Sequence, residues 1–565
     1  MLSASLPAPA TATVSTTLVD GLVRLGVTQA YGVMGGAMAA FFHALAHSPI
    51  TTVHARHEAG AAFAAIEASL ASRRPVVVYT TAGPGLANAL NGMLAARWDG
   101  AHVLFISACT IAPNRGRAAT QETTAALLGP TLFQAGGTLD YAAVIEHPSQ
   151  LGPVLTQLAA GFQDPSGFVA HVSLPIDLQK APCGRLPALG DRRGLVPSCP
   201  MHLVREHAAL LDRGNPVIWV GYGARHAAPQ VRALTERLGA RVMCSPRGKG
   251  IFPEDHPLFL GVTGLAGHEE VEGSLAARRP THTLVLGTRM GEATSFWSPG
   301  LTPSEAFIQV DTDPEVFGLA YPEVPVHPAV AEIGDYLDAL VAALGPARRG
   351  VIAEARRAPE LLTPRAGAVR PQLLMQELQR VAVDGSDAWI MGESGNSFCW
   401  TTHYLRFSVP NRYRLSPTWG SMGHATCGVV GAALARAGKA IAVTGDGAML
   451  MQNELHTAVQ HQADAVWIVL NDGGYLMCAQ GMQMMGWEPF HCALPRVDFV
   501  AMARSLGADG ERVTSEDEMG AALERAMAAR GPWVLDVHID PAERPPSGMR
   551  NHSLMQQGFN AAVRQ

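Results

Sequence analysis

Residues 440–475 read AIAVTGDGAMLMQNELHTAVQHQADAVWIVLNDGGY, and this stretch decides the fold. Two apolar runs, Ala440–Thr444 and Val466–Leu470, stand on either side of a segment with a helical pattern. Apolar strands joined through a helix are typical of a parallel sheet that is buried on both faces. The first run ends at Gly445-Asp446-Gly447-Ala448, and the second ends at Asn471-Asp472-Gly473-Gly474-Tyr475. The stretch therefore predicts a strand–helix–strand unit with a carboxylate after each strand.

This spacing predicts a site for a metal and a phosphate. A unit of this length returns the chain to the same sheet edge, where ligands bind in open α/β sheets. Glycines allow the backbone to approach a phosphate, and a following helix points its N-terminus at the anion. Mg²⁺ prefers carboxylate and phosphate oxygens, so we expect Asp446, Asp472 and the Gly474 carbonyl to hold it. The predicted phosphate-side residues are Gly445, Asp446, Gly447, Ala448, Asp472, Gly474 and Tyr475. A Gly-Asp-Gly alone would often mark only a turn.

The same alternation of apolar runs and helical patterns occurs in two earlier parts of the chain. The runs fall into three groups: Val76–Tyr79, His102–Ile106 and Phe168–Val172; Val217–Val220, Thr283–Leu286 and Phe307–Val310; Ala440–Thr444, Val466–Leu470 and Trp533–Val537. Segments rich in Pro, Gly and charge separate the groups, at Leu174–Pro200 and Leu344–Pro371. We predict three doubly wound, parallel-sheet α/β domains, at residues 1–185, 195–345 and 370–545, with a C-terminal tail at 546–565.

Composition narrows the class of protein. The 565 residues are 48% hydrophobic and 16% charged with a net charge of −6, which indicates a globular enzyme and disfavours a nucleic-acid partner. No apolar run is long enough to cross a membrane, and the N-terminus lacks the features of a signal peptide, so we expect a short disordered tail there. None of the eight cysteines forms a CxxC pair, so we expect reduced thiols and a cytoplasmic location.

Residues 445–475 resemble the thiamine-diphosphate motif of the acetolactate synthase / pyruvate oxidase / benzoylformate decarboxylase family. The resemblance implies pyrimidine-binding, central Rossmann-like and diphosphate-binding domains, with thiamine diphosphate and Mg²⁺ as cofactors. It also implies a homodimer or homotetramer with active sites at the subunit interface. The family usually has Asn where this chain has Asp472. Asp is also a hard oxygen ligand, so the change bears on metal affinity and preference without removing the site.

A second part of the resemblance lies near the N-terminus. Residues 55–63 (ARHEAGAAF) resemble the segment that holds the catalytic glutamate of the family, and residues 81–88 (TAGPGLAN) resemble a motif that follows it. The resemblance implies that Glu58 hydrogen-bonds N1′ of the aminopyrimidine and favours the imino form that removes the C2 proton. In isolation, a Glu at the start of an Ala-rich helix more often interacts only with the helix dipole.

Four further loops carry weaker parts of the resemblance. In residues 418–423 (TWGSMG), Gly420 and Met422 match the loop whose apolar residue wedges between the two thiamine rings, although Met is also a common core residue. Gly395, Asn396 and Ser397 match diphosphate contacts, and an ordinary polar loop is the alternative. Gly36 matches a turn whose amides meet a substrate carbonyl oxygen. Gln121 matches a glutamine on the thiazolium side.

The resemblance implies decarboxylation of a 2-oxo acid and carboligation of the product to a second carbonyl acceptor. The residues that mark two named activities are absent. Cys109-Thr110 stands where simple pyruvate decarboxylases carry a His-His pair, and Gly481 stands where acetolactate synthases carry a Trp. The four Met of residues 475–487 suggest an adaptable acceptor site, or simply a buried helix.

Several alternatives therefore stay open. A non-oxidative decarboxylase that releases an aldehyde and a C–C lyase or hydrolase belong to the same family, whereas a non-catalytic regulatory paralogue is a different class. A flavin or nicotinamide oxidoreductase is suggested by the partial dinucleotide pattern Val220–Ala224 and by residues 287–289 and 310–314. FAD is possible but disfavoured, because many relatives keep this central domain without a nucleotide.

Overall fold

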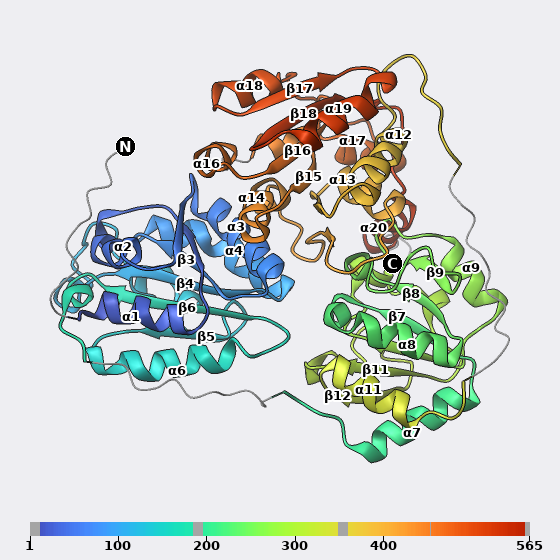
Figure 1. Cartoon of the computed structure of the whole chain (residues 1–565), viewed down its shortest axis with the longest axis horizontal. Helices are drawn as coiled ribbons and strands as arrows, with labels where there is room; N and C mark the ends of the chain where they lie inside the picture. The colour runs from blue at the N-terminus through green and yellow to red at the C-terminus, as the bar shows by residue number, and fades with distance from the viewer. Residues whose placement is uncertain (1–11, 185–195, 348–359, 452–453, 560–565) are drawn as a thin grey trace. The chain divides into compact units, whose positions relative to one another are not determined.

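The computed structural model describes residues 12–184, 196–347, 360–451 and 454–559. Within them, three six-stranded sheets contain only parallel strand pairs (Figure 1). Doubly wound α/β architecture is thus the observed fold, repeated three times. A disordered tail was expected in the N-terminal stretch 1–17; its residues 1–11 lie outside the described residues, and a helix begins at Val14. Parts of both predicted linkers also lie outside the described residues.

The first sheet has the order β2-β1-β3-β4-β6-β5. Its strands are β1 Gln29–Gly32, β2 Thr51–His54, β3 Val76–Thr80, β4 His102–Cys109, β5 Tyr141–Val144 and β6 Phe168–Pro175. Its helices are α1 Val14–Arg24, α2 Ala39–Ala46, α3 Glu58–Ser72, α4 Pro84–Asp99, α5 Ala125–Leu128 and α6 Leu151–Gly161. Apolar side chains of α1, α2 and α6 pack on one face of the sheet, and those of α3 and α4 pack on the other.

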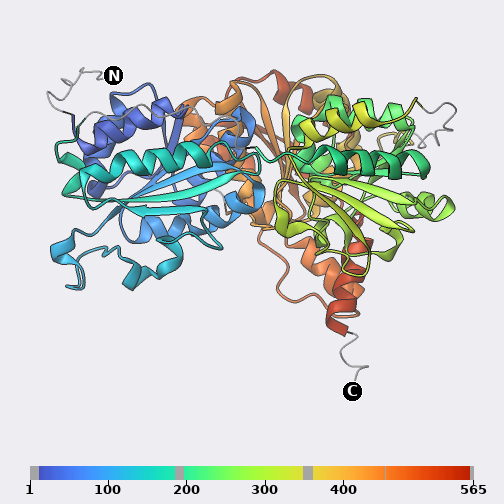
Figure 2. The ribbon, with the colours of Figure 1, turned by 90° about the horizontal axis from the view of Figure 1, so that it is seen from below.

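The central sheet has the order β12-β11-β10-β7-β8-β9. Its strands are β7 Val217–Val220, β8 Arg241–Cys244, β9 Phe259–Val262, β10 His282–Leu286, β11 Ala306–Asp311 and β12 Val326–Val330. Its helices are α7 Met201–Arg213, α8 Ala228–Leu238, α9 Glu270–Ala277, α10 Glu292–Ser295 and α11 Ile333–Ala343. Helices α7, α8 and α11 cover one face, seen as green to yellow helices over green strands in Figure 2, and α9 packs on the other.

The third sheet has the order β14-β13-β15-β16-β18-β17. Its strands are β13 Trp389–Gly392, β14 Tyr413–Arg414, β15 Ala440–Gly445, β16 Ala465–Asn471, β17 Asp509–Val513 and β18 Trp533–His538. The helices of this part are α12 Pro371–Leu378, α13 Asn396–Tyr404, α14 His424–Arg436, α15 Asp446–Met449, α16 Leu455–His461, α17 Leu476–Met484, α18 Phe499–Ser505, α19 Glu516–Ala528 and α20 Gly548–Phe559. Side chains of α12, α13 and α19 bury one face of the sheet.

Internal contacts divide the chain into two compact units. The first unit holds residues 1–195, 426–438 and 452–464, and the second holds residues 196–425, 439–451 and 465–565. Helix α16 and most of α14 therefore pack with the first sheet, although their sequence lies within the predicted third domain. The stretch at 546–565, expected as a tail, includes helix α20. No helix among the described residues combines the length and apolarity that a membrane crossing requires.

Candidate active site

Residues 440–475 contain two neighbouring parallel strands, β15 and β16. Each residue of β15 pairs with one of β16, from Ala440 with Ala465 to Gly445 with Leu470. Asp446 therefore follows the end of one strand, and Asp472 follows the end of the next. The predicted strand–helix–strand unit is confirmed, except that α16, which connects the strands, packs with the first unit.

Backbone amides fix the carboxylate of Asp446. Gly447 donates to Oδ1 at 2.7 Å, and Gly473 and Gly474 donate to Oδ2 at 2.8 and 3.0 Å. Burial raises the pKa of Asp446, whereas these three amides lower it. The side chain is thus held in one orientation, and Oδ1, which accepts a single hydrogen bond, retains a lone pair that a cation could use.

Asp472 completes a pair of carboxylates at the strand ends. Burial, followed by the charge of Asp446, raises the pKa of Asp472 to about 8. A half-buried carboxyl whose pKa is raised by a neighbouring carboxylate lies in an environment that a divalent cation would neutralise. The donor set of Asp446, Asp472 and the Gly474 carbonyl consists of hard oxygens and fits Mg²⁺.

A returning segment supports the loop after β16. Tyr475 N–H donates to Cys492 O, and Leu494 N–H donates to Gly473 O, each at 2.8 Å, so that Gly474 and Ala493 form an antiparallel bridge. A Cβ on Gly447 would come within 2.5 Å of the Tyr475 ring, so only glycine allows this approach. The side chain of Tyr475 is 39% exposed.

The point where the strand order reverses lies between β13 and β15, because the chain runs outward from β13 to β14 before it returns to β15. Ligands of doubly wound sheets bind at such a point. Gly395 and Asn396 follow β13 there, and Gly395 has a φ of +123°, which strongly favours glycine. Asn396 Oδ1 is buried without a hydrogen-bond partner among the described residues. A ligand bearing a donor, or a cation or water held by the diphosphate, would satisfy it.

Hydrogen bonds within the neighbouring loops engage some of the other residues that were predicted to contact the cofactor. The Ser397 hydroxyl donates to Glu393 O at 2.9 Å, so it is engaged within its own helix start. Ser394, which the sequence did not single out, donates to Gly420 O at 2.9 Å and joins the loop after β13 to the loop of Met422. Gly420 has a φ of +69°, and the side chain of Met422 is partly exposed. The wedge role of Met422 stays a prediction.

Helix α17 reaches the Asn396 loop. Asn396 Nδ2 donates to Gln480 Oε1 at 3.2 Å, and Gln480 Nε2 donates to Glu543 O at the same distance. Asn551 of α20 also places its Nδ2 2.9 Å from the sulfur of Met484. The Met-rich segment is therefore a helix that ends at the exposed Met484 and is followed by the exposed Trp487, rather than a plain buried helix.

Glu58 lies in the first unit, at the first position of α3. Its N-cap residue His57 accepts a hydrogen bond from Ala59 N–H through Nδ1. The Glu58 side chain is buried, and its Oε2 accepts a 3.0 Å hydrogen bond from Asn88 Nδ2 on α4. A Cβ on Gly85 would lie 3.0 Å from Glu58 Oε1, so the glycine gives this carboxyl room. The 81–88 motif thus surrounds the acid that precedes it in the sequence.

The two substrate-side candidates lie in loops of the same unit. Gly36 begins a short 3₁₀ turn after β1 and is exposed. A Cβ added to this glycine would have no neighbouring atom within 4 Å. Gln121 is also exposed and has a φ of +54°, a left-handed conformation that costs free energy for a residue with a side chain. Its loop is fixed because Thr123 Oγ1 accepts the Gly83 amide at 2.5 Å. The structure places both residues in loops at strand ends and tests neither role.

The central sheet offers a strand-end position for a nucleotide between β7 and β10. There Gly223 N–H donates to Gly287 O at 3.0 Å, and a Cβ on Gly223 would come within 2.7 Å of the Gly287 Cα. The two loops are in direct backbone contact at the place where a dinucleotide would approach the sheet. This geometry gives no support to FAD.

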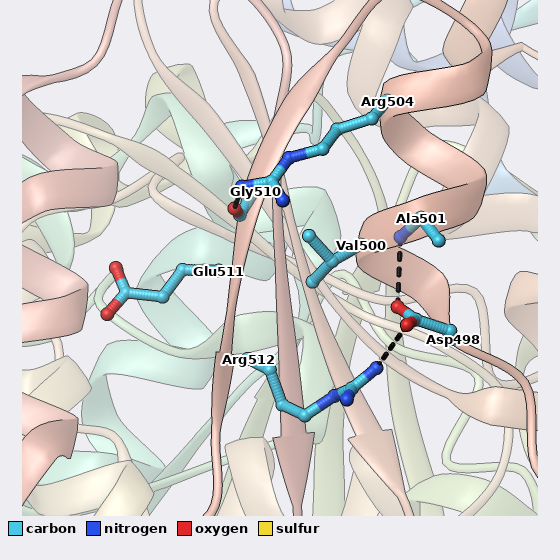
Figure 3. A pocket seen from close by; sticks show the side chains of 7 residues that line it. All are labelled: Asp498, Val500, Ala501, Arg504, Gly510, Glu511 and Arg512. Atoms are coloured by element: carbon cyan, nitrogen blue, oxygen red, sulfur yellow. Dashed lines mark hydrogen bonds and ion pairs between the residues drawn. The ribbon is translucent and has the colours of Figure 1, made fainter.

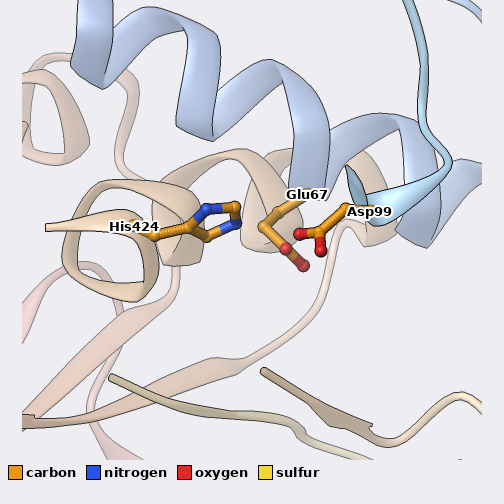
Figure 4. A group of neighbouring side chains, drawn as sticks. All are labelled: Glu67, Asp99 and His424. Atoms are coloured by element: carbon orange, nitrogen blue, oxygen red, sulfur yellow. The ribbon is translucent and has the colours of Figure 1, made fainter. Parts of the chain in front are cut away.

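Two other groups of polar side chains lie apart from the strand-end loops. A cavity of about 560 Å³ beside α18 and β17 is lined by paired charges, including Asp498 with Arg512 at 2.7 Å (Figure 3). In the first unit, Glu67 of α3 and Asp99 of α4 are buried with carboxyl oxygens within 4.8 Å of one another (Figure 4). The first group is an ion-pair network, and the second belongs to the contact between two helices.

Comparisons with known proteins agree with this geometry. Three family models match: the N-terminal thiamine pyrophosphate (TPP) binding domain of the TPP enzymes at residues 12–128, their central domain at 205–340 and their C-terminal TPP binding domain at 393–537. The "Putative acetolactate synthase large subunit IlvB2" of Mycobacterium tuberculosis is 31% identical, over 87% of this chain and 91% of that protein. The "Probable 2-ketoarginine decarboxylase AruI" of Pseudomonas aeruginosa is 28% identical, over 93% and 94%.

A solved structure has the same fold. The thiamine diphosphate-dependent 4-hydroxybenzoylformate decarboxylase of Rhodococcus jostii RHA1 superposes with a TM-score of 0.81 at 21% identity, over 94% of this chain and 99% of that one. The strand-end carboxylates, the buried Glu58 and the three matched domains lead to one conclusion. This chain belongs to the thiamine pyrophosphate enzyme family.

Proposed function

We propose that this protein uses thiamine diphosphate and Mg²⁺ to decarboxylate a 2-oxo acid and to join the remaining acyl unit to a second carbonyl compound. The observation that carries the proposal is the pair Asp446 and Asp472 at the ends of β15 and β16, with Asp446 held by three backbone amides. That arrangement fits a metal–diphosphate group at the end of a parallel sheet.

Different residues of the chain would contact the metal and the diphosphate of the cofactor. Asp446, Asp472 and the Gly474 carbonyl would hold Mg²⁺. The backbone of Gly445, Gly447 and Ala448 would lie beside the diphosphate at the start of α15, while the Gly447 amide stays bound to Asp446 Oδ1. Asn396 Oδ1, in the loop after β13, has no partner among the described residues and would contact a cation or water held by the diphosphate. When bound, thiamine diphosphate supplies a carbon nucleophile and an electron sink for loss of CO₂.

Glu58 would hold a proton at Oε1 for N1′ of the aminopyrimidine, because Asn88 already occupies Oε2. The carboxyl is buried and its Oε2 is held by Asn88, so little reorganisation accompanies proton transfer. Met422 would set the angle between the two rings, and Gly36 and Gln121 would meet the substrate. Glu58 and Asp446 belong to different units, and we propose that one active site takes them from two subunits of a homodimer or homotetramer.

The relatives include both a synthase and a decarboxylase by their printed names, so carboligation is the finer part of the proposal. The Met-rich helix α17, with Met484 exposed, supports an apolar acceptor site. Non-oxidative release of an aldehyde, or cleavage of a C–C bond, are the alternative reactions. All eight cysteines are free thiols, which supports a cytoplasmic location.

The test is incubation of the full-length protein with thiamine diphosphate, Mg²⁺ and a panel of 2-oxo acids, with and without aldehyde or ketone acceptors. Products are identified by mass spectrometry. A coupled product that requires the acceptor supports carboligation. Release of CO₂ and an aldehyde, with no coupled product from any acceptor, would establish the decarboxylase instead. A Glu58→Gln protein with full activity would contradict the role of Glu58 in either reaction.

A further inference from the structure

Glu454 is a buried acid that none of the roles above uses. It precedes α16, it is 1% exposed, and its carboxylate contacts a segment almost 400 positions away in the sequence. Oε1 accepts hydrogen bonds from the backbone amides of Arg56 and His57, each at 3.1 Å. Oε2 accepts from the Arg56 amide at 3.2 Å and from the Thr457 hydroxyl at 2.5 Å. The Glu454 carboxylate thus accepts hydrogen bonds from the backbone of both residues directly before Glu58.

Side chains of α16 also form hydrogen bonds with the same segment. Arg56 donates from Nε to His456 Nδ1 at 2.8 Å and from Nη2 to Gln460 Oε1 at 2.6 Å. The Thr457 hydroxyl also lies 3.4 Å from His54 O. All of these residues belong to the first unit. Two of the three residues between β2 and α3, Arg56 and His57, are therefore hydrogen-bonded to α16 or to the residue that precedes it.

The absence of a side chain at Gly60, in the first turn of α3, makes room for this contact. A Cβ on Gly60 would collide with Oε1 of Glu454, so the glycine lets the carboxylate reach the backbone. Burial raises the pKa of Glu454, whereas Thr457 and the two amides lower it. The acid replaces the water that would otherwise satisfy amides at the exposed beginning of a helix.

We propose that Glu454 is a positioning residue that fixes the start of α3 and thereby the carboxyl of Glu58. The inference rests on the proposed role of Glu58 in cofactor activation. His57 is the N-cap of α3, and its amide is one of the two that Glu454 holds. Loss of the hydrogen bonds from these two amides to Glu454 would let the N-cap and the first residue of α3 shift. A displacement of about 1 Å in a reacting group can cost about a hundredfold in rate.

The test measures exchange of the C2 proton of bound thiamine diphosphate for deuterium, by acid quench and proton NMR, without any substrate. Five full-length proteins are compared: wild type, Glu58→Gln, Glu454→Ala, Glu454→Gln and Glu516→Ala. Glu516 is a matched control, because it is also buried and accepts the amides of Arg365 and Arg370, residues with no role in the proposed site. Cofactor affinity is measured in parallel by calorimetry.

We expect Glu454→Ala to slow exchange by about tenfold or more, with cofactor affinity unchanged. Glu454→Gln keeps an oxygen that can accept both amides, so it should restore most of the rate. Glu516→Ala should exchange at the wild-type rate. If Glu454→Ala does not fold, Glu454→Asp keeps the charge but withdraws the oxygens by one methylene, and it should also be slow.

Two results would overturn the inference. One is wild-type exchange in Glu454→Ala, or in Glu454→Asp, while Glu58→Gln is slow. The other is a Glu454→Gln protein as slow as Glu454→Ala, because charge rather than position would then be responsible. Wild-type exchange in Glu58→Gln is a different failure, since it would remove the proposed role of Glu58 itself.

Discussion

Asn88 of α4 donates a 3.0 Å hydrogen bond from Nδ2 to Oε2 of Glu58, the first residue of α3. The two residues are separated by 30 positions and by strand β3, and their helices pack on the same face of the first sheet. The bond leaves one carboxyl oxygen of Glu58 for the cofactor and fixes the rotation of the carboxyl plane. Asn88 is therefore part of the environment of the proposed catalytic acid.

Replacement of Asn88 by Ala should lower kcat by about tenfold, because a partly buried hydrogen bond to a carboxyl group contributes about 1–2 kcal/mol. Cofactor affinity should change little, since the proposed ligands of Mg²⁺ and the diphosphate do not include Asn88. Steady-state kinetics with saturating thiamine diphosphate is the measurement. Asn114→Ala, at an exposed 3₁₀ turn, serves as the control. Equal kcat values for both variants would argue against the role of Asn88.

Asp446 and Asp472 should differ in their effect on Mg²⁺. Asp446→Ala should weaken Mg²⁺ binding at least about a hundredfold, because a charge about 4 Å from a cation contributes a few kcal/mol and three amides lose their acceptor. Asp472→Asn keeps an oxygen ligand and should weaken binding much less. It should also raise the Tm of the metal-free protein by removing the repulsion from Asp446. Calorimetric titration with Mg²⁺ and thiamine diphosphate distinguishes the two, and equal losses would exclude this metal assignment.

Helix α14 approaches α3 closely at Gly431, within the first unit. A Cβ at Gly431 would collide with the backbone carbonyl of Ala64, which cannot move without its helix. Gly431→Ala should therefore cost about 1–3 kcal/mol in the free energy of unfolding. Gly273→Ala on α9 is the matched control, because open space surrounds that position and alanine favours a helix. Urea denaturation should show opposite signs for the two variants.

His171 should make stability depend on pH between about 6.5 and 4. Complete burial lowers the pKa of His171 from 6.5 to about 4, while the carbonyl of Leu132 acts in the opposite direction. The unfolded chain therefore binds a proton that the folded chain rejects, and stability falls as the pH drops below 6.5. Between pH 7 and pH 5 the loss from this residue amounts to about 2 kcal/mol.

The comparison of wild type with His171→Gln by urea denaturation at pH 7 and pH 5 checks this. The variant starts less stable, because His171 also hydrogen-bonds Ser107 at 2.9 Å, but it should lose less stability on acidification. An identical loss in both proteins would show that His171 is not the group that titrates.

The sequence by itself determined the features that depend on local pattern. The apolar runs predicted nine of the eighteen described strands, and the observed ends differ by no more than three residues, as at β4, which extends to Cys109. Periodicity and glycine punctuation report local backbone geometry, so the parallel sheets and the carboxylates after β15 and β16 were predictable. The start of α3 at Glu58 followed from the same kind of signal. The family resemblance supplied the chemistry that these residues would perform.

Only the tertiary structure decided which distant groups meet. Glu454 and the amides of Arg56 and His57, Ser394 and Gly420, and Asn396 and Gln480 become partners because helices and loops pack against one another. The same holds for α20, in a stretch where a tail was expected. A buried carboxylate must find donors wherever the fold brings them, and no sequence spacing encodes that choice. The strand-end site is therefore a property of the local sequence, and the environment that orients Glu58 is a property of the packed fold.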